Sequence, residues 1–499
     1  MTAASLYQNY LDTMRKHADV EHTLALLHWD KEINLPSKGN AFRAQQLATL
    51  SGIAHEIITS PELGETLEQL DSQRDKLEAI ESRNIKLSLK AYRKTQKFSK
   101  DFVIRRSNVI SKAYDAWLKA REANDFSLYQ EALNEMVALK KEEAELIGYE
   151  DHPYDALLDE YEPNAKTADL VSLFKEVESQ LVDFVREIRA YPQLKDSFLH
   201  QQFDGNKQWQ FGLDLLKNMG YDFEAGRQDK SPHPFTTTFS PKDVRVTTRI
   251  DEQFFGSMTW SCIHEGGHAL YEQGLPAKSY GLPSGKACSL GIHESQSRLW
   301  ENNVGRGLPY WKAHYPQLQQ TFPDALGAVP LEQFYKGINK IAPSLIRTES
   351  DELHYHFHIL IRFEIEKGLL EGRYASNDLK EVWNDRYKAY LDLDVPDDRS
   401  GILQDIHWAY GNFGYFPTYS LGSFYAAQFY HQAQSDLPDL EHQIAMGNNV
   451  PLLEWLRNHI HQYGQYYSAE ELCERITGEK LNFKYFMDYV KSKFKLIYN

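Results

Sequence analysis

The chain has 499 residues, of which 42% are hydrophobic and 25% charged, and its formal net charge is −16. These proportions are typical of a globular protein with a large core, and the length alone suggests about three domains. The acidic charge, without an extended Lys/Arg tract, excludes nucleic acid as the expected main partner. No stretch approaches the ~18 uninterrupted apolar residues of a membrane span, and the first residues lack the apolar core of a signal peptide. We therefore expect a cytoplasmic protein without membrane partners.

Long amphipathic helices are predicted for most of the chain. From Leu6 to about His200, apolar residues recur at three- and four-residue spacing, and the breaks between them are too short for an interdomain linker. Helical spacing returns after Ile250 and continues to the end of the sequence. A loop rich in glycine and aromatic residues, Gly401–Gly422, interrupts it.

The segment between Ser231 and Ile250, "SPHPFTTTFSPKDVRVTTRI", has a different composition. Threonine, valine and proline replace the helix formers, which predicts a short hairpin or an edge strand. The sequence therefore predicts a mainly α fold, in which a large helical body carries a small β-sheet next to the motif that follows.

That motif is "HEGGH", in which His264 and His268 are four residues apart. On a helix they lie about 40° apart on one face, so both imidazoles can reach one cation. Glu265 projects about 100° away from His264, where it can touch a metal-bound water but is badly placed as a ligand. This pattern is typical of zinc-dependent peptidases, with Glu265 as the general base.

A catalytic zinc site needs a third protein ligand and an open position for water. Glu294 is the predicted third ligand, because it lies on the next predicted helix and turn residues separate that helix from "HEGGH". Two alternatives remain open: His293 is a rival ligand, and Glu294 could instead form a surface salt bridge with Arg298.

Two adjacent glycines within a helix each cost roughly 1 kcal/mol relative to alanine. Gly267 is expected to border the metal-facing side, where a side chain would crowd a bound substrate. Gly266 is expected to allow a neighbouring helix to approach closely. The alternative is that both glycines serve packing alone.

Several separate segments, in order, resemble conserved elements of the Taq-type metallocarboxypeptidase family over most of the length. They are "HPFTTTFSPKDVRVTTR", "HEGGHALYEQG", "HESQSRLWEN" and "GILQDIHW", with "LLHWDKEINLPSKG" and "YDALLDEYEP" earlier in the chain. One departure is Ser350 in "IRTESDE", where the family usually has alanine.

The resemblance implies a helical, groove-containing fold related to angiotensin-converting enzyme and neurolysin, and a homodimer. It implies removal of single C-terminal amino acids from peptides with broad specificity. We expect one divalent metal per chain, Zn²⁺ first and Co²⁺ as the alternative, since the same ligands accept both. Residues 1–499 are expected to form one helical domain, with two lobes on either side of the groove as the alternative arrangement.

A carboxypeptidase must bind a free terminal carboxylate, and a planar guanidinium does so with two hydrogen bonds. Arg347 is the first choice for this role, and a structural pair with Asp351 is the alternative. The segment Val244–Thr248 is expected to be an edge strand that holds the substrate backbone by strand addition. Arg245 on that strand is a candidate substrate-binding residue or a brace for the strand.

The loop at Gly401–Gly422 offers donors for the oxyanion that forms during hydrolysis. Related folds pair a histidine with a tyrosine for this purpose, so the resemblance favours His407 and Tyr419, with Tyr415 in reserve or as a substrate contact. The histidines of "HYHFH" (His354, His356 and His358) are expected to be satisfied core or groove residues rather than a second metal site.

Two other functions compete with this prediction. An oligopeptidase or dipeptidyl carboxypeptidase would use the same zinc chemistry but release different products. A non-catalytic helical scaffold would keep the metal for structure, although structural zinc sites usually have four cysteine or histidine ligands.

Overall fold

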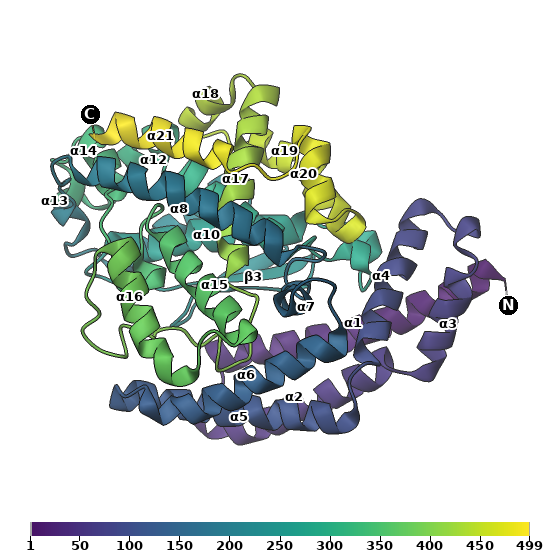
Figure 1. The fold of residues 1–499 in the computed structure, drawn as a ribbon. Coiled ribbons are helices and arrows are strands. Elements are labelled where there is room, and N and C mark those ends of the chain that lie inside the picture. Colours follow the sequence, from purple (N-terminus) through teal and green to yellow (C-terminus); the bar gives the residue numbers. More distant parts are fainter. Residues whose placement is uncertain (1, 499) are drawn as a thin grey trace. The chain divides into compact units, whose positions relative to one another are not determined.

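The computed structural model describes residues 2–498, which divide into two compact units. Each unit is assembled from three separate stretches of the chain. Unit 1 comprises residues 2–96, 195–338 and 425–481, and unit 2 comprises residues 97–194, 339–424 and 482–498. The mainly helical fold with a small sheet is confirmed (Figure 1). The expectation of a single domain stays a prediction.

Unit 1 consists of helices around one small sheet, and its helix ends follow from local sequence. Ser60 caps α3 at Leu63 N with Pro61 in the first turn, and Asp204 caps α9, which ends at Gly220 with φ 95°. The helices of this unit are α1 (Ala3–Ile33), α2 (Asn40–Ile58), α3 (Pro61–Asp71), α4 (Ala79–Thr95), α9 (Gly205–Met219), α10 (Phe255–Gly274), α11 (Leu290–Arg298), α12 (Leu308–Thr321), α13 (Pro323–Leu326), α14 (Leu331–Ile338), α18 (Leu440–Ala445), α19 (Val450–His459) and α20 (Ala469–Thr477).

The sheet has three strands in the order β1-β3-β2. Strands β2 (Thr236–Ser240) and β3 (Asp243–Thr248) form the predicted hairpin, and β1 (Gly226–Lys230) adds a parallel neighbour on the other side of β3. The expectation that Val244–Thr248 is an edge strand is therefore wrong. Strand β3 is the central strand, because its backbone pairs with β1 on one side and with β2 on the other. It therefore has no free edge that could pair with a substrate strand.

Helix α10 carries "HEGGH" and is packed on three sides within unit 1. The sheet contacts it through Thr248, whose hydroxyl lies 2.7 Å from that of Ser261. A Cβ added to Gly266 would lie 2.7 Å from Leu216 Cδ2 of α9. The expectation that this glycine lets a neighbouring helix approach closely is therefore confirmed. At Gly267 a Cβ would lie 2.6 Å from Gln296 O of α11, so this glycine admits a helix and does not make room for substrate.

Unit 2 is also helical and is built around α15, which is buried along most of its length. Arg362 and Glu366 of this helix are completely buried, although both are ionisable. The helices of this unit are α5 (Lys100–Ala123), α6 (Ser127–Ile147), α7 (Pro153–Leu158), α8 (Thr167–Arg189), α15 (Tyr355–Glu371), α16 (Leu379–Leu391) and α21 (Lys484–Tyr498). Helix α17 (Pro417–Asp436) contains residues of both units.

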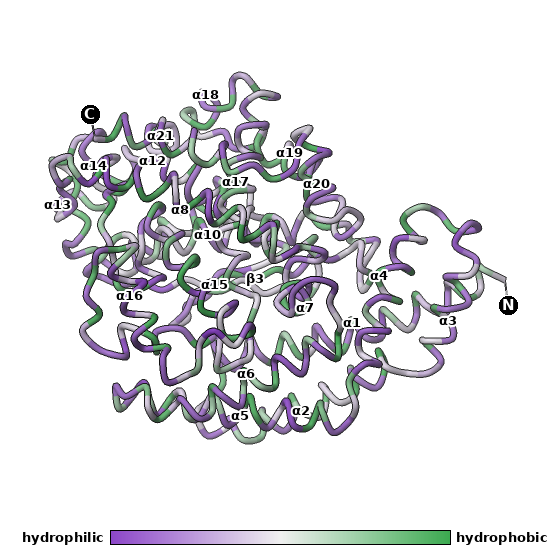
Figure 2. Tube along the Cα trace, viewed as in Figure 1, coloured by the Kyte–Doolittle hydropathy of each residue, from purple (hydrophilic) through white to green (hydrophobic). Residues whose placement is uncertain are grey.

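Hydrophobic and hydrophilic residues alternate along most of the helices, as Figure 2 shows. This pattern is typical of helices with one face in a protein core and the other in water. Within residues 2–498, no helix combines the length and the apolar composition that crossing a membrane requires.

Candidate active site

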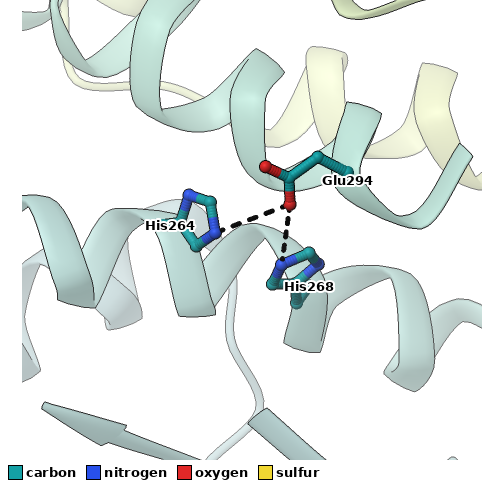
Figure 3. A group of neighbouring side chains, drawn as sticks. All are labelled: His264, His268 and Glu294. Atoms are coloured by element: carbon teal, nitrogen blue, oxygen red, sulfur yellow. Dashed lines mark ion pairs between the residues drawn. The ribbon is translucent and has the colours of Figure 1, made fainter. Parts of the chain in front are cut away.

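Two histidines of α10 and one glutamate of α11 converge at a single point (Figure 3). Glu294 Oε2 lies 3.7 Å from His264 Nε2 and 3.4 Å from His268 Nε2. The three predicted metal ligands are thus brought together, with one ligand atom from each within 4.8 Å of the others. Within residues 2–498 this is the one group of histidine, cysteine and acidic side chains with that geometry.

The second nitrogen of each imidazole ring is already engaged. His264 Nδ1 lies 2.9 Å from Glu301 Oε2, and His268 Nδ1 lies 3.1 Å from the carbonyl oxygen of His293. Because a carboxylate and a carbonyl only accept hydrogen bonds, both Nδ1 atoms donate, and both Nε2 atoms present lone pairs. This orientation is that of metal-ligating histidines. Two imidazole nitrogens and one carboxylate oxygen therefore fit a zinc-type divalent ion.

Glu294 uses its two oxygens for two different contacts. Oε2 faces the histidines, while Oε1 accepts a 2.7 Å hydrogen bond from Arg298 Nε. The predicted alternative, a salt bridge to Arg298, is present together with the ligand geometry and holds the carboxylate in orientation. The rival ligand His293 is bonded elsewhere, with Nε2 2.9 Å from Glu272 Oε1.

Electrostatics at these residues favour a cation. Burial raises the pKa of Glu294, but Arg298 and His264 outweigh it and hold the pKa well below its usual range. Burial lowers the pKa of His268 to about 3, so this ring is neutral. At His264, burial lowers the pKa, yet the carboxylates of Glu294 and Glu301 raise it overall. The carboxylates around His264 thus favour a positive charge at its Nε2, which a proton supplies in the metal-free protein and a metal ion would supply in its place.

Glu265, the predicted general base, lies against the edge strand of the sheet. The hydroxyl of Thr236 on β2 lies 2.6 Å from Glu265 Oε2 and 3.0 Å from the Glu265 backbone oxygen. The carboxylate is buried, and burial raises its pKa. Thr236 and Glu301 were not predicted as site residues, because their contacts to Glu265 and His264 join parts of the chain far apart in sequence.

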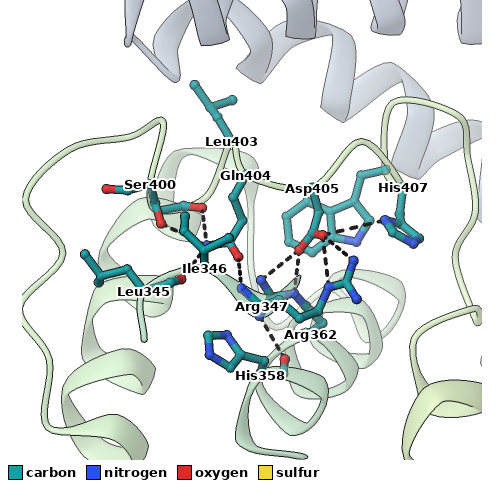
Figure 4. A network of polar contacts seen from close by, with 12 residues as sticks. Leu345, Ile346, Arg347, His358, Arg362, Ser400, Leu403, Gln404, Asp405 and His407 are labelled. Atoms are coloured by element: carbon teal, nitrogen blue, oxygen red, sulfur yellow. Dashed lines mark hydrogen bonds and ion pairs between the residues drawn. The ribbon is translucent and has the colours of Figure 1, made fainter. Parts of the chain in front are cut away.

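Arg347, the predicted carboxylate-binding residue, is buried in unit 2 and paired with Asp405 (Figure 4). Its Nε and Nη2 atoms donate to Asp405 Oδ1 at 3.0 and 2.9 Å, and Nη1 donates to the Tyr355 hydroxyl at 3.2 Å. The alternative of a structural pair named Asp351, which is the wrong partner because its carboxylate lies 2.7 Å from His354 Nδ1, but Arg347 does form a buried ion pair, with Asp405.

A second buried arginine shares the same aspartate. Arg362 Nε donates to Asp405 Oδ2 at 2.7 Å, so two guanidiniums meet one carboxylate. We call Arg347, Arg362 and Asp405 the arginine cluster. Gln404 holds it in place, since its Oε1 accepts from Arg347 N at 2.9 Å and its Nε2 donates to the carbonyl of Leu345 at 2.9 Å. The segments "IRTESDE" and "GILQDIHW" are thereby tied together.

His407, Tyr419 and Tyr415 gather next to the arginine cluster. His407 Nε2 lies 3.2 Å from the Tyr419 hydroxyl, and the ring of Tyr415 is 5.3 Å from each of these two rings. Arg347 lies over the Tyr419 ring at 4.8 Å. Burial lowers the pKa of His407 to about 3, so the imidazole is neutral. The three residues are therefore neighbours within unit 2, although the loop predicted for Gly401–Gly422 ends earlier, because Tyr419 lies on α17 (Pro417–Asp436).

Arg245 makes the contacts of a brace. Its Nε and Nη2 atoms each donate to Asp243 at 2.9 Å, and the guanidinium lies 4.4 Å from the ring of Trp29 and 4.8 Å from that of Phe239. These contacts join β3 to β2 and to α1. They favour the bracing role over the substrate-binding role.

The three histidines of "HYHFH" have three different partners. His354 contacts Asp351, His356 Nδ1 lies 2.9 Å from Ser420 Oγ, and His358 Nδ1 lies 3.0 Å from the Tyr387 hydroxyl. All three rings are buried. They are core residues with separate hydrogen bonds.

Comparison with known proteins gives one consistent result. Residues 9–494 match the model of the carboxypeptidase Taq (M32) metallopeptidase family. The thermostable carboxypeptidase 1 of Thermus thermophilus is 40% identical over 511 residues, covering 100% of both chains. The solved structure of a protein designated CHT is 57% identical, covers 98% of this chain and 99% of its own, and superimposes with a TM-score of 0.97. For the M32 carboxypeptidase of Deinococcus radiodurans R1 the identity is 35%, the coverage 99% of each chain and the TM-score 0.97.

These matches define the class of the protein as a metallocarboxypeptidase, a peptide hydrolase. The chain belongs to the carboxypeptidase Taq (M32) metallopeptidase family. The family resemblance found in the sequence is confirmed, and membership in a metallopeptidase family implies a divalent metal ion and peptide substrates.

Proposed function

We propose that His264, His268 and Glu294 bind one divalent metal per chain, Zn²⁺ or Co²⁺, and that the enzyme removes single C-terminal amino acids with broad specificity. The observation that carries the proposal is the convergence of three ligand atoms while both Nδ1 atoms are held by acceptors. The metal, when bound, supplies Lewis-acid polarisation of the scissile carbonyl and of the attacking water.

Glu265 acts as the general base and acid in this proposal. Its carboxylate accepts the proton of the attacking water and then delivers it to the leaving amine. Thr236 supports this role, because its hydroxyl hydrogen bond orients Glu265 Oε2. The neutral His407 and Tyr419 are the proposed donors to the oxyanion, with Tyr415 as an alternative donor or substrate contact.

Arg347 binds the terminal carboxylate of the substrate in this proposal. Two guanidiniums share one aspartate in the arginine cluster, so the cluster carries more positive than negative charge and suits an anion. The substrate backbone pairs with the edge strand β2, which replaces the central strand β3 in the role expected from the sequence. The homodimer is proposed on the family resemblance, and the molar mass in solution from light scattering tests it.

One peptide in two forms, free acid and C-terminal amide, tests the function with and without a chelator. Loss of single residues from the free acid only, stopped by the chelator and restored by Zn²⁺ or Co²⁺, is the expected result. Cleavage of both forms, or release of dipeptides, would favour an oligopeptidase or dipeptidyl carboxypeptidase. No cleavage after metal is supplied would favour a non-catalytic scaffold.

A further inference from the structure

Glu301 is a buried carboxylate close to the proposed metal ligands, and it takes no direct part in the proposed hydrolysis. Its Oε2 lies 2.9 Å from His264 Nδ1 and 3.3 Å from Arg298 Nη1, and its Oε1 lies 3.4 Å from Arg306 Nη2. The Glu301 carboxylate thus contacts one imidazole and two guanidinium groups. A carboxylate that is buried to this degree costs several kcal/mol unless such partners stabilise it.

Arg298 links Glu301 to the third ligand. Its Nε donates to Glu294 Oε1 at 2.7 Å, while its Nη1 donates to Glu301 Oε2. The two glutamates therefore contact opposite edges of the His264 ring, Glu294 at Nε2 and Glu301 at Nδ1. The ring cannot turn about its side-chain bonds without losing the hydrogen bond at Nδ1.

The backbone around Glu301 has an unusual conformation. The helix after α11 continues as a π-helix, η6 (Leu299–Gly305), in which Arg306 N donates to Glu301 O at 2.9 Å. Widened turns of this kind are rare and occur often at functional sites. Arg306 fastens this turn to its surroundings, since its guanidinium lies 4.0 Å from the Trp260 ring of α10 and donates to the carbonyl of Ile338 at 2.7 Å.

We propose that Glu301 is a positioning residue for the metal: through Nδ1 it fixes the tautomer and orientation of His264, and through Arg298 it couples this ring to Glu294. The inference rests on the proposed metal site. It states that Glu301 determines how tightly the metal is held, although its carboxylate is not a ligand.

The chain offers a matched control for this test. Glu272 is about as buried as Glu301, with a side chain 12% exposed against 11%, and it also contacts a histidine beside the site, at 2.9 Å from His293 Nε2. His293 is not one of the three converging residues. Glu301→Gln and Glu272→Gln therefore remove the same charge at a similar degree of burial, but only the first acts on a proposed ligand.

The experiment measures the dissociation constant for Zn²⁺ by competition with a chelator, and the absorption spectrum after Co²⁺ is added. Glu301→Gln is expected to weaken Zn²⁺ binding about 10- to 100-fold and to change the Co²⁺ spectrum, whereas Glu272→Gln leaves both as in the wild type. Glu301→Asp keeps the charge but withdraws it from His264, so we expect weakened binding there as well. Thermal melting of the metal-free proteins identifies any variant that is misfolded. If Glu301→Gln is misfolded, the Zn²⁺ affinity of Glu301→Asp decides the test.

The outcomes separate this inference from the proposed function. Equal Zn²⁺ affinity for Glu301→Gln and Glu272→Gln would overturn the inference about Glu301. The proposed metal site would still stand in that case, provided that the wild type binds Zn²⁺. If the wild type binds no Zn²⁺, or His264→Ala binds it as tightly as the wild type, the proposed function fails and the inference falls with it.

Discussion

Unit 1 and unit 2 each contain a buried ionic group. Carboxylates outnumber guanidiniums around the converging residues of unit 1, whereas guanidiniums outnumber carboxylates in the arginine cluster of unit 2. The first group contains three carboxylates and two guanidiniums, namely Glu265, Glu294 and Glu301 with Arg298 and Arg306. The arginine cluster contains two guanidiniums and one carboxylate. Buried charge is costly when it is unbalanced, so the sign of the imbalance in each group predicts the charge of its ligand.

This difference in composition predicts ligands of opposite charge for the two groups. With His264 neutral, the group in unit 1 lacks positive charge, which a divalent metal would supply in place of a proton on that ring. The arginine cluster lacks negative charge, which a terminal carboxylate would supply. Four experiments test the roles assigned to these groups.

Glu265→Gln removes the general base without removing a proposed ligand. We expect kcat to fall about 10²- to 10⁴-fold, because this is the usual contribution of a positioned acid or base. Metal content, measured on the same sample, is expected to equal that of the wild type. A metal-loaded variant with normal turnover would show that Glu265 is not the base.

Asp405→Asn leaves two buried guanidiniums without their anion, so we expect the free energy of unfolding at pH 7 to fall by about 3–5 kcal/mol. The arginines hold the pKa of Asp405 well below its usual range, although burial alone would raise it. The folded protein thus binds fewer protons here than the unfolded chain does at acid pH. The stability difference between wild type and variant is therefore constant above about pH 5 and shrinks as the pH falls below about 4.

Denaturant unfolding of both proteins across this pH range measures the difference. A stability difference that stays constant down to pH 3 would contradict the assignment of an ionised Asp405 as the shared partner of both arginines.

Arg347→Lys replaces a planar donor pair with a single point charge. We expect kcat/KM for a free-acid peptide to fall roughly 100-fold, mainly through KM, since a buried charged contact to the substrate is lost. Arg245→Lys is the matched control, because Arg245 is also bonded to a nearby aspartate but braces the sheet. Equal losses in the two variants would remove the basis for assigning the carboxylate to Arg347.

Gly267→Ala and Gly266→Ala add the same methyl group on two sides of α10. At Gly267 the new atom meets the backbone of α11 at Gln296 and Ser297, so we expect a loss of about 1–3 kcal/mol and weaker metal binding as Glu294 is displaced. At Gly266 it meets the flexible ends of Leu216 and Met219, and the gain in helix propensity of roughly 1 kcal/mol offsets the cost. Thermal melting and Zn²⁺ titration compare the two, and an equal effect would contradict the role assigned to the α10–α11 contact.

Local patterns in the sequence were enough to predict the helices and the converging ligands. The spacing of His264 and His268 determines a shared helix face wherever that helix lies in the fold. Glu294 was predicted from its place on the next predicted helix and from the need of a catalytic zinc site for a third protein ligand. The hairpin was also predicted, since Thr236–Thr248 is rich in β-branched residues.

Other features had no local signal. Strand β1, "GRQDK", is polar and reads as a loop, and only its pairing with β3 makes it a strand. Without β1, β3 was taken for an edge strand, and this error also misplaced the expected site of substrate pairing. Arg347 was given Asp351 as an alternative partner from its spacing, whereas Asp405, 58 positions away in the chain, holds it.

Periodicity and short motifs act within a few residues, so they predicted the helical body and the "HEGGH" helix, whereas the family resemblance indicated the carboxypeptidase class and most of the other site residues. Only the tertiary structure decided what orients them: Glu301 at His264, Thr236 at Glu265, Asp405 at Arg347 and the α11 backbone at Gly267. Each of these contacts joins elements that pack together only after folding. Hydrogen bonds and close packing depend on distances of a few ångströms, and no spacing along the chain specifies such distances between separate helices.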